Sequence, residues 1–472
     1  MSTSRLKCRF AFGYSPNVRN GIHFTENNKA VIHPAGHGVA IVSVSKDQPG
    51  GYISGSPNST GLSAIAMSSD KQLIAIAENS TKGFLVNVYD MNKPDEPIET
   101  LCGSEEEPDI LSLAFCSDKS RILTLSGKKS EMSMSMWDWK GEKKKRVVRS
   151  KTKVYKDETI LHLSCGTSPE DRTACCLVGG NVVKLFRAVE QDEIFHPIIG
   201  AKTPSYSKTV YGDAVCHTWA TKSRGRLFVG TSKGNVVLIE SGEILGVVKC
   251  TRDIAVPIYS IFSTASGGIV CGCAKSTLIR VVAKENSSTN TSPLEAFELK
   301  DTRLVANVEK QRDEEEEYDE EEDEQNDMIK SSAIVGLAVS SATSRVVCAL
   351  DSKQILVVKE NSRGIGNVVR NEVSISPLNN GFHTRVGVSS SAAITGMDVC
   401  LKRPLVVTCG ADSCVRVWNY LEGTCELEQH FAEETLSVAI HPYVFISMFK
   451  RENIALSLSL SLTHTHTPLC SP

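Results

Sequence analysis

Three short stretches decide the fold: Val86–Asp90 (VNVYD), Met134–Asp138 (MSMWD) and Val415–Asn419 (VRVWN). Each alternates apolar residues with others, as a half-buried β-strand does, and then ends on a large aromatic residue followed by Asp or Asn. The pattern recurs along the chain, in some copies with an aliphatic residue in place of the aromatic one. We take the large residue of each copy as its marker, which gives Val42, Tyr89, Trp137, Phe186, Ile239, Val282, Val358 and Trp418.

The spacing of these markers predicts the architecture. Successive markers lie 47, 48, 49, 53, 43, 76 and 60 residues apart, and the first five spacings approach the ~40–45-residue period of WD-type propeller blades. Paired alternating runs joined by a Ser/Asp turn, such as Leu62–Ala77 and Ile110–Leu125, supply further strands. A four-stranded blade cannot cover both of its faces, so like blades bury them by stacking in a ring. The prediction is an all-β, WD40-type β-propeller. The alternative, unrelated strands of a β-sandwich, would not repeat one marker at near-constant spacing.

The markers also predict the domain boundaries. Seven of them occur up to Val358, which predicts a seven-bladed propeller over residues 1–360 with an acidic disordered insertion at about 301–330. The polar, glycine-rich segment 361–389 is predicted to be a linker, and residues 390–445 the truncated start of a second propeller. A strand near Leu6–Phe12 could complete the last blade of either ring.

The last residues differ in character from the rest of the chain. Residues 446–472 contain Ser-Leu and Thr-His repeats, which dinucleotide repeats in DNA encode. We expect an aberrant, disordered tail that arises from read-through or from an alternative end.

Composition argues against several classes of protein. The net charge of -3 offers no electrostatic attraction to nucleic acid or to an anionic membrane. The chain has no run of eighteen apolar residues, and its first residues lack the apolar core of a secretory signal. Its 16 cysteines are scattered through apolar runs, which is typical of small buried side chains in a reducing compartment. We therefore expect a soluble, intracellular protein.

Two charged runs are candidate partner contacts. The basic run contains Lys143, Lys144, Lys145 and Arg146, and the acidic run contains Glu314, Glu315, Glu316 and Glu317. Either run can simply be a solvated loop between strands. In a functional role, the basic run would contact an acidic protein such as tubulin and the acidic run a basic partner.

The sequence gives no clear signal for catalysis. The phosphate-binding G-x-x-x-x-G-K-[ST] and the metalloprotease H-E-x-x-H are absent, and the letters G-x-S-x-G occur at 230–234 (GTSKG), in a glycine turn that we expect to connect two strands of a hairpin. Cys271 and Cys273 alternate on a strand and are expected in the core, while the Trp137–Asp138 pair is expected to be structural. We predict no catalytic residue, no cofactor, no metal and no small-molecule substrate. A propeller enzyme, with polar residues converging on the central channel, remains the alternative.

Longer runs resemble one family. The run VIHPAGHGVAIVSV (Val31–Val44), with PAGH at Pro34–His37, and the run RPLVVTCGADSCVRVWNY within Ser391–Pro442 carry the resemblance. They are similar to the cilia- and flagella-associated protein fifty-seven family, also called WD-repeat protein sixty-five, over roughly Arg9 to Pro442. After Pro442 the sequence departs from the family pattern, which continues through further blades.

The resemblance implies a non-enzymatic scaffold on the ciliary axoneme. The family has tandem propellers followed by long coiled coils, and it supports inner dynein arm docking and ciliary beating. Its implied partners are axonemal or dynein-arm proteins, with tubulin as a further candidate. A general WD-repeat adaptor outside cilia, in ubiquitin ligation or trafficking, is the alternative function.

Overall fold

The computed structural model divides the chain into two compact units, Met1–Asn379 (unit 1) and Asn380–Pro472 (unit 2). It describes residues 11–459 except for 12, 19–20, 45–49, 104–108, 129–130, 142–145, 154–161, 167–173, 190–193, 199–205, 222–224, 251–255, 266, 284–296, 304–331, 341, 343–344, 366–367, 380–392, 422–423, 441–444 and 451–454.

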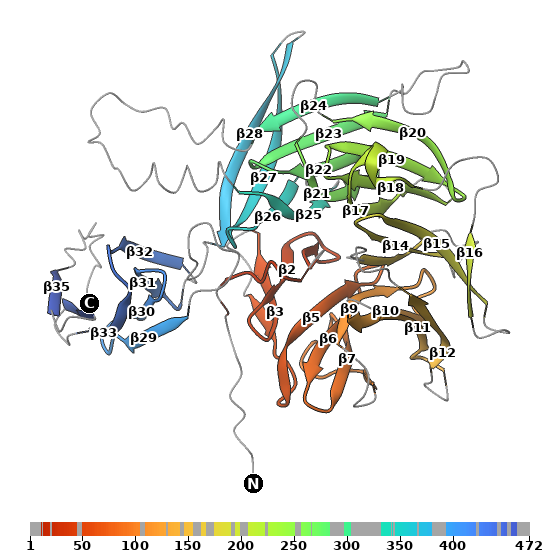
Figure 1. The fold of residues 1–472 in the computed structure, drawn as a ribbon. Coiled ribbons are helices and arrows are strands. Elements are labelled where there is room, and N and C mark those ends of the chain that lie inside the picture. Colours follow the sequence, from red (N-terminus) through yellow and green to blue (C-terminus); the bar gives the residue numbers. More distant parts are fainter. Residues whose placement is uncertain are drawn as a thin grey trace, which may run out of the picture. The chain divides into compact units, whose positions relative to one another are not determined.

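The described part of unit 1 contains seven antiparallel sheets, each built from four consecutive strands (Figure 1). The first four sheets are β1 (His23–Phe24), β2 (Ala30–Ala35), β3 (Gly38–Ser43) and β4 (Gly51–Ile53); β5 (Ser59–Met67), β6 (Leu73–Ser80), β7 (Gly83–Asp90) and β8 (Glu99–Cys102); β9 (Ile110–Phe115), β10 (Arg121–Lys128), β11 (Glu131–Asp138) and β12 (Arg146–Lys153); and β13 (His162–Cys165), β14 (Ala174–Gly179), β15 (Val182–Val189) and β16 (Ile194–Ile198).

The remaining three sheets of unit 1 follow a single helical turn, α1 (Lys208–Tyr211). They are β17 (Ala214–Trp219), β18 (Arg226–Thr231), β19 (Asn235–Glu240) and β20 (Glu243–Lys249); β21 (Ile258–Ser263), β22 (Ile269–Cys273), β23 (Thr277–Ala283) and β24 (Phe297–Arg303); and β25 (Ile334–Ser340), β26 (Arg345–Leu350), β27 (Ile355–Ile365) and β28 (Val368–Asn379).

These sheets pack face to face around a ring. The first strands of successive sheets lie against one another, as β5 does against β9 and β21 against β25, and β25 in turn contacts β1. They are therefore the strands nearest the ring axis. An apolar cluster that joins Phe24 and Val31 of the first sheet to Val347 and Val357 of the seventh closes the ring. Unit 1 is thus a β-propeller in which neighbouring sheets bury each other's apolar faces.

The turn between the first two strands of a sheet repeats as closely as the strands do. In the second sheet Lys71 N–H donates to Ser68 O, and in the third Lys119 N–H donates to Cys116 O. Both lysines have positive φ, 61° and 59°. Lys119 Nζ also lies 2.5 Å from Asp70 Oδ2 in the turn of the preceding sheet, so the repeated Ser-Asp-Lys turn helps to fix the spacing of neighbouring sheets.

Unit 2 contains one four-stranded and one three-stranded sheet. Its core is an apolar cluster in which Val407, Val415 and Val417 of the first sheet meet Val438 of the second. The strands are β29 (Ile394–Val399), β30 (Leu405–Gly410), β31 (Cys414–Asn419) and β32 (Thr424–His430), then β33 (Thr435–Ile440), β34 (Phe445–Lys450) and β35 (Ala455–Ser459).

The structure differs from the predicted boundaries in two places. Residues 361–379, predicted to be linker, extend β27 and β28 into a long antiparallel hairpin that pairs Ile365 with Val368. The polar composition was misleading because β28 is the outermost strand of its sheet, and an edge strand need not be apolar. Similarly, β34 and β35 lie where the aberrant tail was predicted to begin, because alternating Ser and Leu also suits a strand.

Other predictions fall mostly outside the described residues. The strand expected near Leu6–Phe12 and the insertion from residue 304 onward lie there. No helix of the described part is long and apolar enough to cross a membrane.

Candidate interaction site

The marker residues occupy one structural position. All eight lie in the third strand of a four-stranded sheet, from Val42 in β3 to Trp418 in β31. Where the packing is described, the marker faces the preceding sheet. Tyr89 joins the cluster that contains Ile32 of the first sheet, and Ile239 joins Val178 of the fourth. The repeated large residue therefore fills the space between adjacent sheets.

The sixth marker needs a correction. In β22 and β23 the pair Ile269–Val281 corresponds to the pairs Leu227–Ile239 and Val346–Val358 of the neighbouring sheets. Val281 is buried in the cluster between the fifth and sixth sheets. Val281, and not Val282, therefore occupies the marker position, because a shift of one residue along a strand moves a side chain to the opposite face.

The two tryptophan markers make the same hydrogen bond. Trp137 Nε1–H donates to Thr124 Oγ1 at 3.0 Å, and Trp418 Nε1–H donates to Thr408 Oγ1 at 2.8 Å. In each case a threonine on the second strand accepts the hydrogen bond of the buried indole. Asp138 Oδ1 accepts a bond from Gly141 N–H at 2.8 Å and thereby holds the following turn. These contacts are structural.

A chain of polar contacts crosses the innermost strands of three sheets. Ser112 Oγ of β9 lies 3.0 Å from His162 Nδ1 of β13. Ser164 of β13 lies 2.5 Å from His217 Nε2 of β17 and also accepts a bond from Trp219 Nε1–H at 2.8 Å. The two imidazole rings are 4.9 Å apart. This inner seam ties the third, fourth and fifth sheets together near the ring axis.

The alternative function, a propeller enzyme, predicts polar residues that converge on the central channel. The inner seam is a group of polar residues near the ring axis, so its chemistry is relevant to this alternative. Burial, and secondarily the neighbouring His162, hold the pKa of His217 well below its usual value. His217 is 4% exposed, and its Nε2 is occupied by Ser164. A neutral, buried imidazole in such a bond joins sheets and offers no accessible acid or base.

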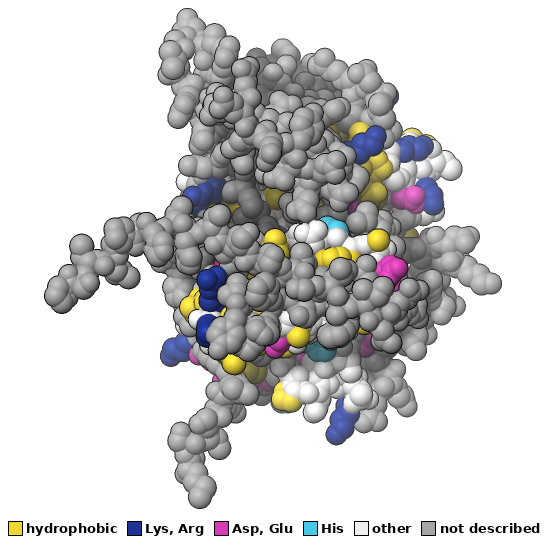
Figure 2. Space-filling model, turned by 90° about the vertical axis from the view of Figure 1, so that its left-hand side faces the viewer, with side chains coloured by type: hydrophobic (Ala, Val, Ile, Leu, Met, Phe, Trp, Pro, Cys, Tyr) yellow, Lys and Arg dark blue, Asp and Glu magenta, His cyan; other side chains and the backbone are white. Residues whose placement is uncertain are grey.

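The two predicted charged runs lie largely outside the described residues. This holds for Lys143 to Lys145 and for Glu314 to Glu317. Arg146 begins β12 and is paired in register with Trp137, so the basic run leads directly into the outermost strand of the third sheet. On the face shown in Figure 2, the described charged side chains of both signs are interspersed with hydrophobic ones.

The most exposed apolar stretch of the described residues lies in unit 2, on and just after β29. Met397 is 64% exposed and Leu401 is 90% exposed, and Ile394 and Val399 are also exposed. Met397 is paired with Thr408, so it lies on the marker face of its sheet, the one that carries Trp418. In unit 1 that face is covered by the preceding sheet. Within the described part of unit 2 no sheet precedes β29, and clustered exposed apolar side chains mark interaction sites. We refer to Ile394, Met397, Val399 and Leu401 as the β29 patch.

Relatives of known name share this sequence over most of its length. No protein-family model matches the chain. Cilia- and flagella-associated protein 57 of Mus musculus is 23% identical over 472 residues, covering 94% of this chain and 35% of the mouse protein. Cilia- and flagella-associated protein 57 C of Tetrahymena thermophila is 19% identical over 509 residues, covering 93% of this chain and 36% of that protein. The chain thus spans about a third of the length of these curated relatives.

Solved structures share the fold. A chain of the "Crystal Structure of Mitotic Checkpoint Complex" superposes with a TM-score of 0.50 at 13% identity, covering 75% of this chain and 93% of that chain. The "Crystal structure of RRP9 WD40 repeats" gives a TM-score of 0.45 at 14% identity, covering 72% and 92%. The ring of four-stranded sheets in unit 1 and the match at a TM-score of 0.50 confirm the predicted all-β, WD40-type propeller. This chain is thus similar over nearly its whole length to the proteins named cilia- and flagella-associated protein 57.

Proposed function

We propose that the chain is a non-catalytic WD-repeat scaffold of the ciliary axoneme that supports docking or assembly of inner dynein arms. The observation that carries the proposal is similarity over 94% of the chain to a mouse protein named for cilia and flagella, with further relatives of that name in Tetrahymena. The partners that we propose are axonemal or dynein-arm proteins, and tubulin for the basic run.

The architecture supports a binding role. A propeller offers loops on two rims and the outer strands of every sheet, which lets one rigid body hold several proteins. The β29 patch adds a place where a partner gains free energy by covering exposed apolar side chains. We propose that an axonemal protein with a complementary apolar surface covers this patch.

The test uses the tagged full chain in ciliated cells. We expect the protein in the axoneme, and we expect dynein-arm components to co-purify with it from isolated axonemes. Met397→Glu would place a charge in the β29 patch and reduce co-purification. The matched control is Val210→Glu on α1, a residue that is 61% exposed and lies away from the patch in sequence.

Each outcome discriminates between the alternatives. A protein that stays in the cytoplasm and co-purifies with a ubiquitin-ligase or trafficking complex would establish the adaptor function instead. If Met397→Glu and Val210→Glu both bind as well as the unaltered chain, the β29 patch is not the contact.

A further inference from the structure

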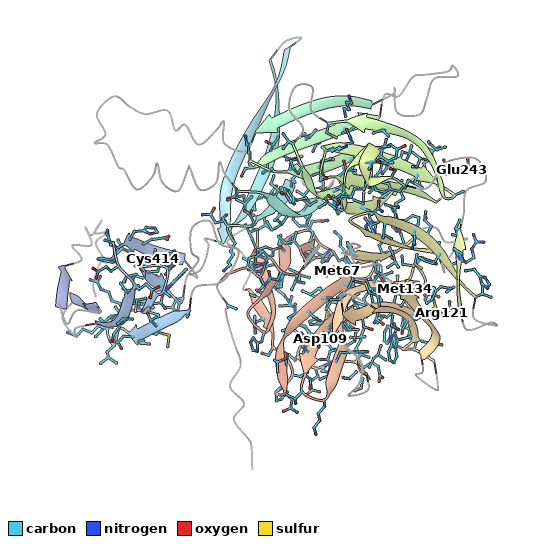
Figure 3. The ribbon with its side chains drawn as sticks, in the orientation of Figure 1. Met67, Asp109, Arg121, Met134, Glu243 and Cys414 are labelled. Atoms are coloured by element: carbon cyan, nitrogen blue, oxygen red, sulfur yellow. The ribbon has the colours of Figure 1, made fainter. Side chains whose placement is uncertain are left out.

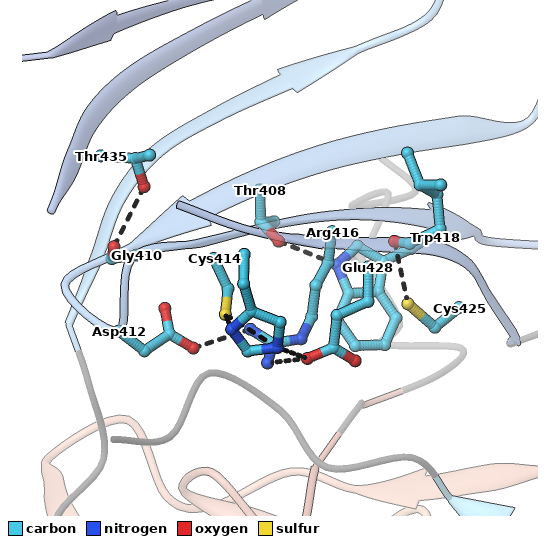
Figure 4. A network of polar contacts seen from close by, with 11 residues as sticks. Thr408, Gly410, Asp412, Cys414, Arg416, Trp418, Cys425, Glu428 and Thr435 are labelled. Carbon is cyan, nitrogen blue, oxygen red and sulfur yellow. Dashed lines mark hydrogen bonds and ion pairs between the residues drawn. The ribbon is translucent and has the colours of Figure 1, made fainter. Parts of the chain in front are cut away.

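The hairpin of β31 and β32 brings a thiol, a carboxylate and an imidazole to one face of unit 2 (Figure 4). Cys414 is paired in register with His430, and Arg416 is paired with Glu428. Because side chains alternate along a strand, these four residues share one face while Val415, Val417 and Leu427 point to the other, into the core. Cys414 is the first residue of β31, at the open end of the hairpin (Figure 3).

The potential ligand atoms are close together. Cys414 Sγ lies 2.8 Å from His430 Nδ1 and 3.6 Å from His430 Nε2, and His430 Nε2 lies 3.5 Å from Glu428 Oε1. One ligand atom from each of the three residues falls within 4.8 Å of the other two. We propose that Cys414, Glu428 and His430 bind one Zn²⁺ ion, with water as the fourth ligand.

The donor set and its dimensions suit zinc. Thiolate, imidazole and carboxylate are its usual protein ligands, at bond lengths of about 2.0–2.3 Å in a tetrahedron. Two ligand atoms on one tetrahedral ion are then roughly 3.3–3.8 Å apart. With His430 Nε2 as the ligand atom, both of its distances, 3.6 Å to Cys414 Sγ and 3.5 Å to Glu428 Oε1, already fall in this range. The side chain of His430 is 51% exposed, which leaves room for the water ligand.

The charges around the site balance with zinc in place. Arg416 Nη1 donates to the fully buried Asp412 Oδ2 at 2.8 Å, and Arg416 Nη2 donates to Glu428 Oε1. The Arg416–Asp412 pair is neutral, so the thiolate and the Glu428 carboxylate together offset the two charges of the ion. The bond from Arg416 holds the Glu428 carboxylate in place beside His430.

Protons compete with the metal at this site. The imidazole of His430 and the thiol of Cys414 each bind zinc without their proton. Binding releases protons and weakens as pH falls, since both ligands coordinate in their deprotonated forms.

When Co²⁺ takes the place of Zn²⁺, its absorption spectrum shows whether a thiolate is among the ligands. We would free the full chain of metal with a chelator and titrate it with Co²⁺ and then with Zn²⁺. We expect one equivalent of Co²⁺ to bind with a thiolate-to-cobalt charge-transfer band and the visible bands of a tetrahedral ion. Zn²⁺ should displace it. Cys414→Ser should abolish the charge-transfer band, and His430→Gln should weaken binding by at least the roughly 10–100-fold that removal of a second-shell partner costs.

The matched control is Cys425→Ser on β32. Cys425 is a nearby thiol whose pKa burial raises to about 12, and its Sγ donates to Leu427 O. We expect this variant to keep the band. A chain that binds no stoichiometric Co²⁺, or a band that survives Cys414→Ser, would show that the three residues form a hydrogen-bond network without a metal. If Cys414→Ser fails to fold by circular dichroism, His430→Gln, at a half-exposed side chain, decides between the two outcomes.

Discussion

A large buried side chain with one polar atom can stabilise the fold in two ways, by apolar packing and by a hydrogen bond. The indole of Trp137 is 6% exposed, packs edge-on against Phe84 at a centroid distance of 6.1 Å, and donates to Thr124. The side chain therefore contributes apolar packing between the second and third sheets as well as a satisfied hydrogen bond. The two contributions can be separated by substitution.

Trp137→Ala should lower the free energy of unfolding of unit 1 by about 3–5 kcal/mol, because it opens a cavity between two sheets. Trp137→Phe keeps most of the packing and loses the bond to Thr124, so it should cost about 1–2 kcal/mol. Denaturant titration of the full chain measures both values. Leu245→Ala, at a residue 37% exposed, is the control and should change stability little. Equal effects of the two tryptophan substitutions would contradict a separate role for the hydrogen bond.

A second buried residue makes the propeller sensitive to acid. His33 is fully buried beside Tyr14, and burial lowers its pKa to about 4. His33 is thus neutral in the folded chain and takes up a proton in the unfolded chain below about pH 6.5. The free energy of unfolding is unaffected above that pH and should fall by about 3 kcal/mol as pH decreases from 6.5 to 4.

The measurement is the denaturation midpoint as a function of pH. His33→Phe should flatten the profile between pH 6.5 and 4, whereas His196→Phe, at an exposed histidine of β16, should leave it unchanged. An identical slope for unaltered chain and His33→Phe would mean that other groups, such as His217, account for the acid sensitivity.

At the scale of strands, hydrogen bonds join the innermost strands of neighbouring sheets. Besides the inner seam, Ser260 Oγ of β21 donates to Ile334 O of β25 at 2.7 Å. In unit 2 Thr395 of β29 donates to Thr435 O of β33 at 2.5 Å. A small hydroxyl residue on one first strand thus bonds to the next first strand in both units.

Ser164→Ala tests this arrangement where it is densest. The substitution leaves His217 Nε2 and Trp219 Nε1 without the partner that they share, so we expect a loss of about 2–4 kcal/mol. Amide exchange should accelerate in β13 and β17 more than in β5 or β6. The control is Ser63→Ala, whose hydroxyl donates within its own sheet to Ala77 O. Uniform acceleration across all strands would contradict a local seam.

At the scale of the whole molecule, the two units differ in how completely they bury their sheets. Unit 1 closes on itself, so each described sheet has a neighbour on both faces. In unit 2 the described residues leave the β29 patch exposed, and burial of apolar surface is the dominant favourable contribution to folding. Unit 2 should therefore be the less stable part.

Two separate thermal transitions are the expected consequence. Trp418→Ala should lower the transition of unit 2, which comes first, and Trp137→Ala should lower that of unit 1. Limited proteolysis should cut within unit 2 before unit 1. A single transition that both substitutions shift equally would show instead that the units unfold together.

Local pattern determined the fold class and much of the element order. Alternation with a period of two and a large residue at the end of each third strand are properties of short segments. The markers from Tyr89 to Trp418, apart from Val282, could therefore be placed without coordinates. The error at Val282 has the same origin, because a valine on either face of a strand looks alike until its register with Ile269 is known.

Contacts between strands were decided only by tertiary structure. The inner seam joins Ser112, His162 and His217, which are about 50 residues apart in sequence at each step, and the proposed zinc ligands include Cys414, 16 residues from His430. The Glu-x-His pattern of β32 was visible in the sequence, but its cysteine could be found only from the pairing of β31 with β32. Sequence alone indicated most of the strands and their alternation, since these follow from local backbone geometry. Packing determined which residues became neighbours, because strand pairing and contacts between sheets bring together residues that are far apart in the sequence.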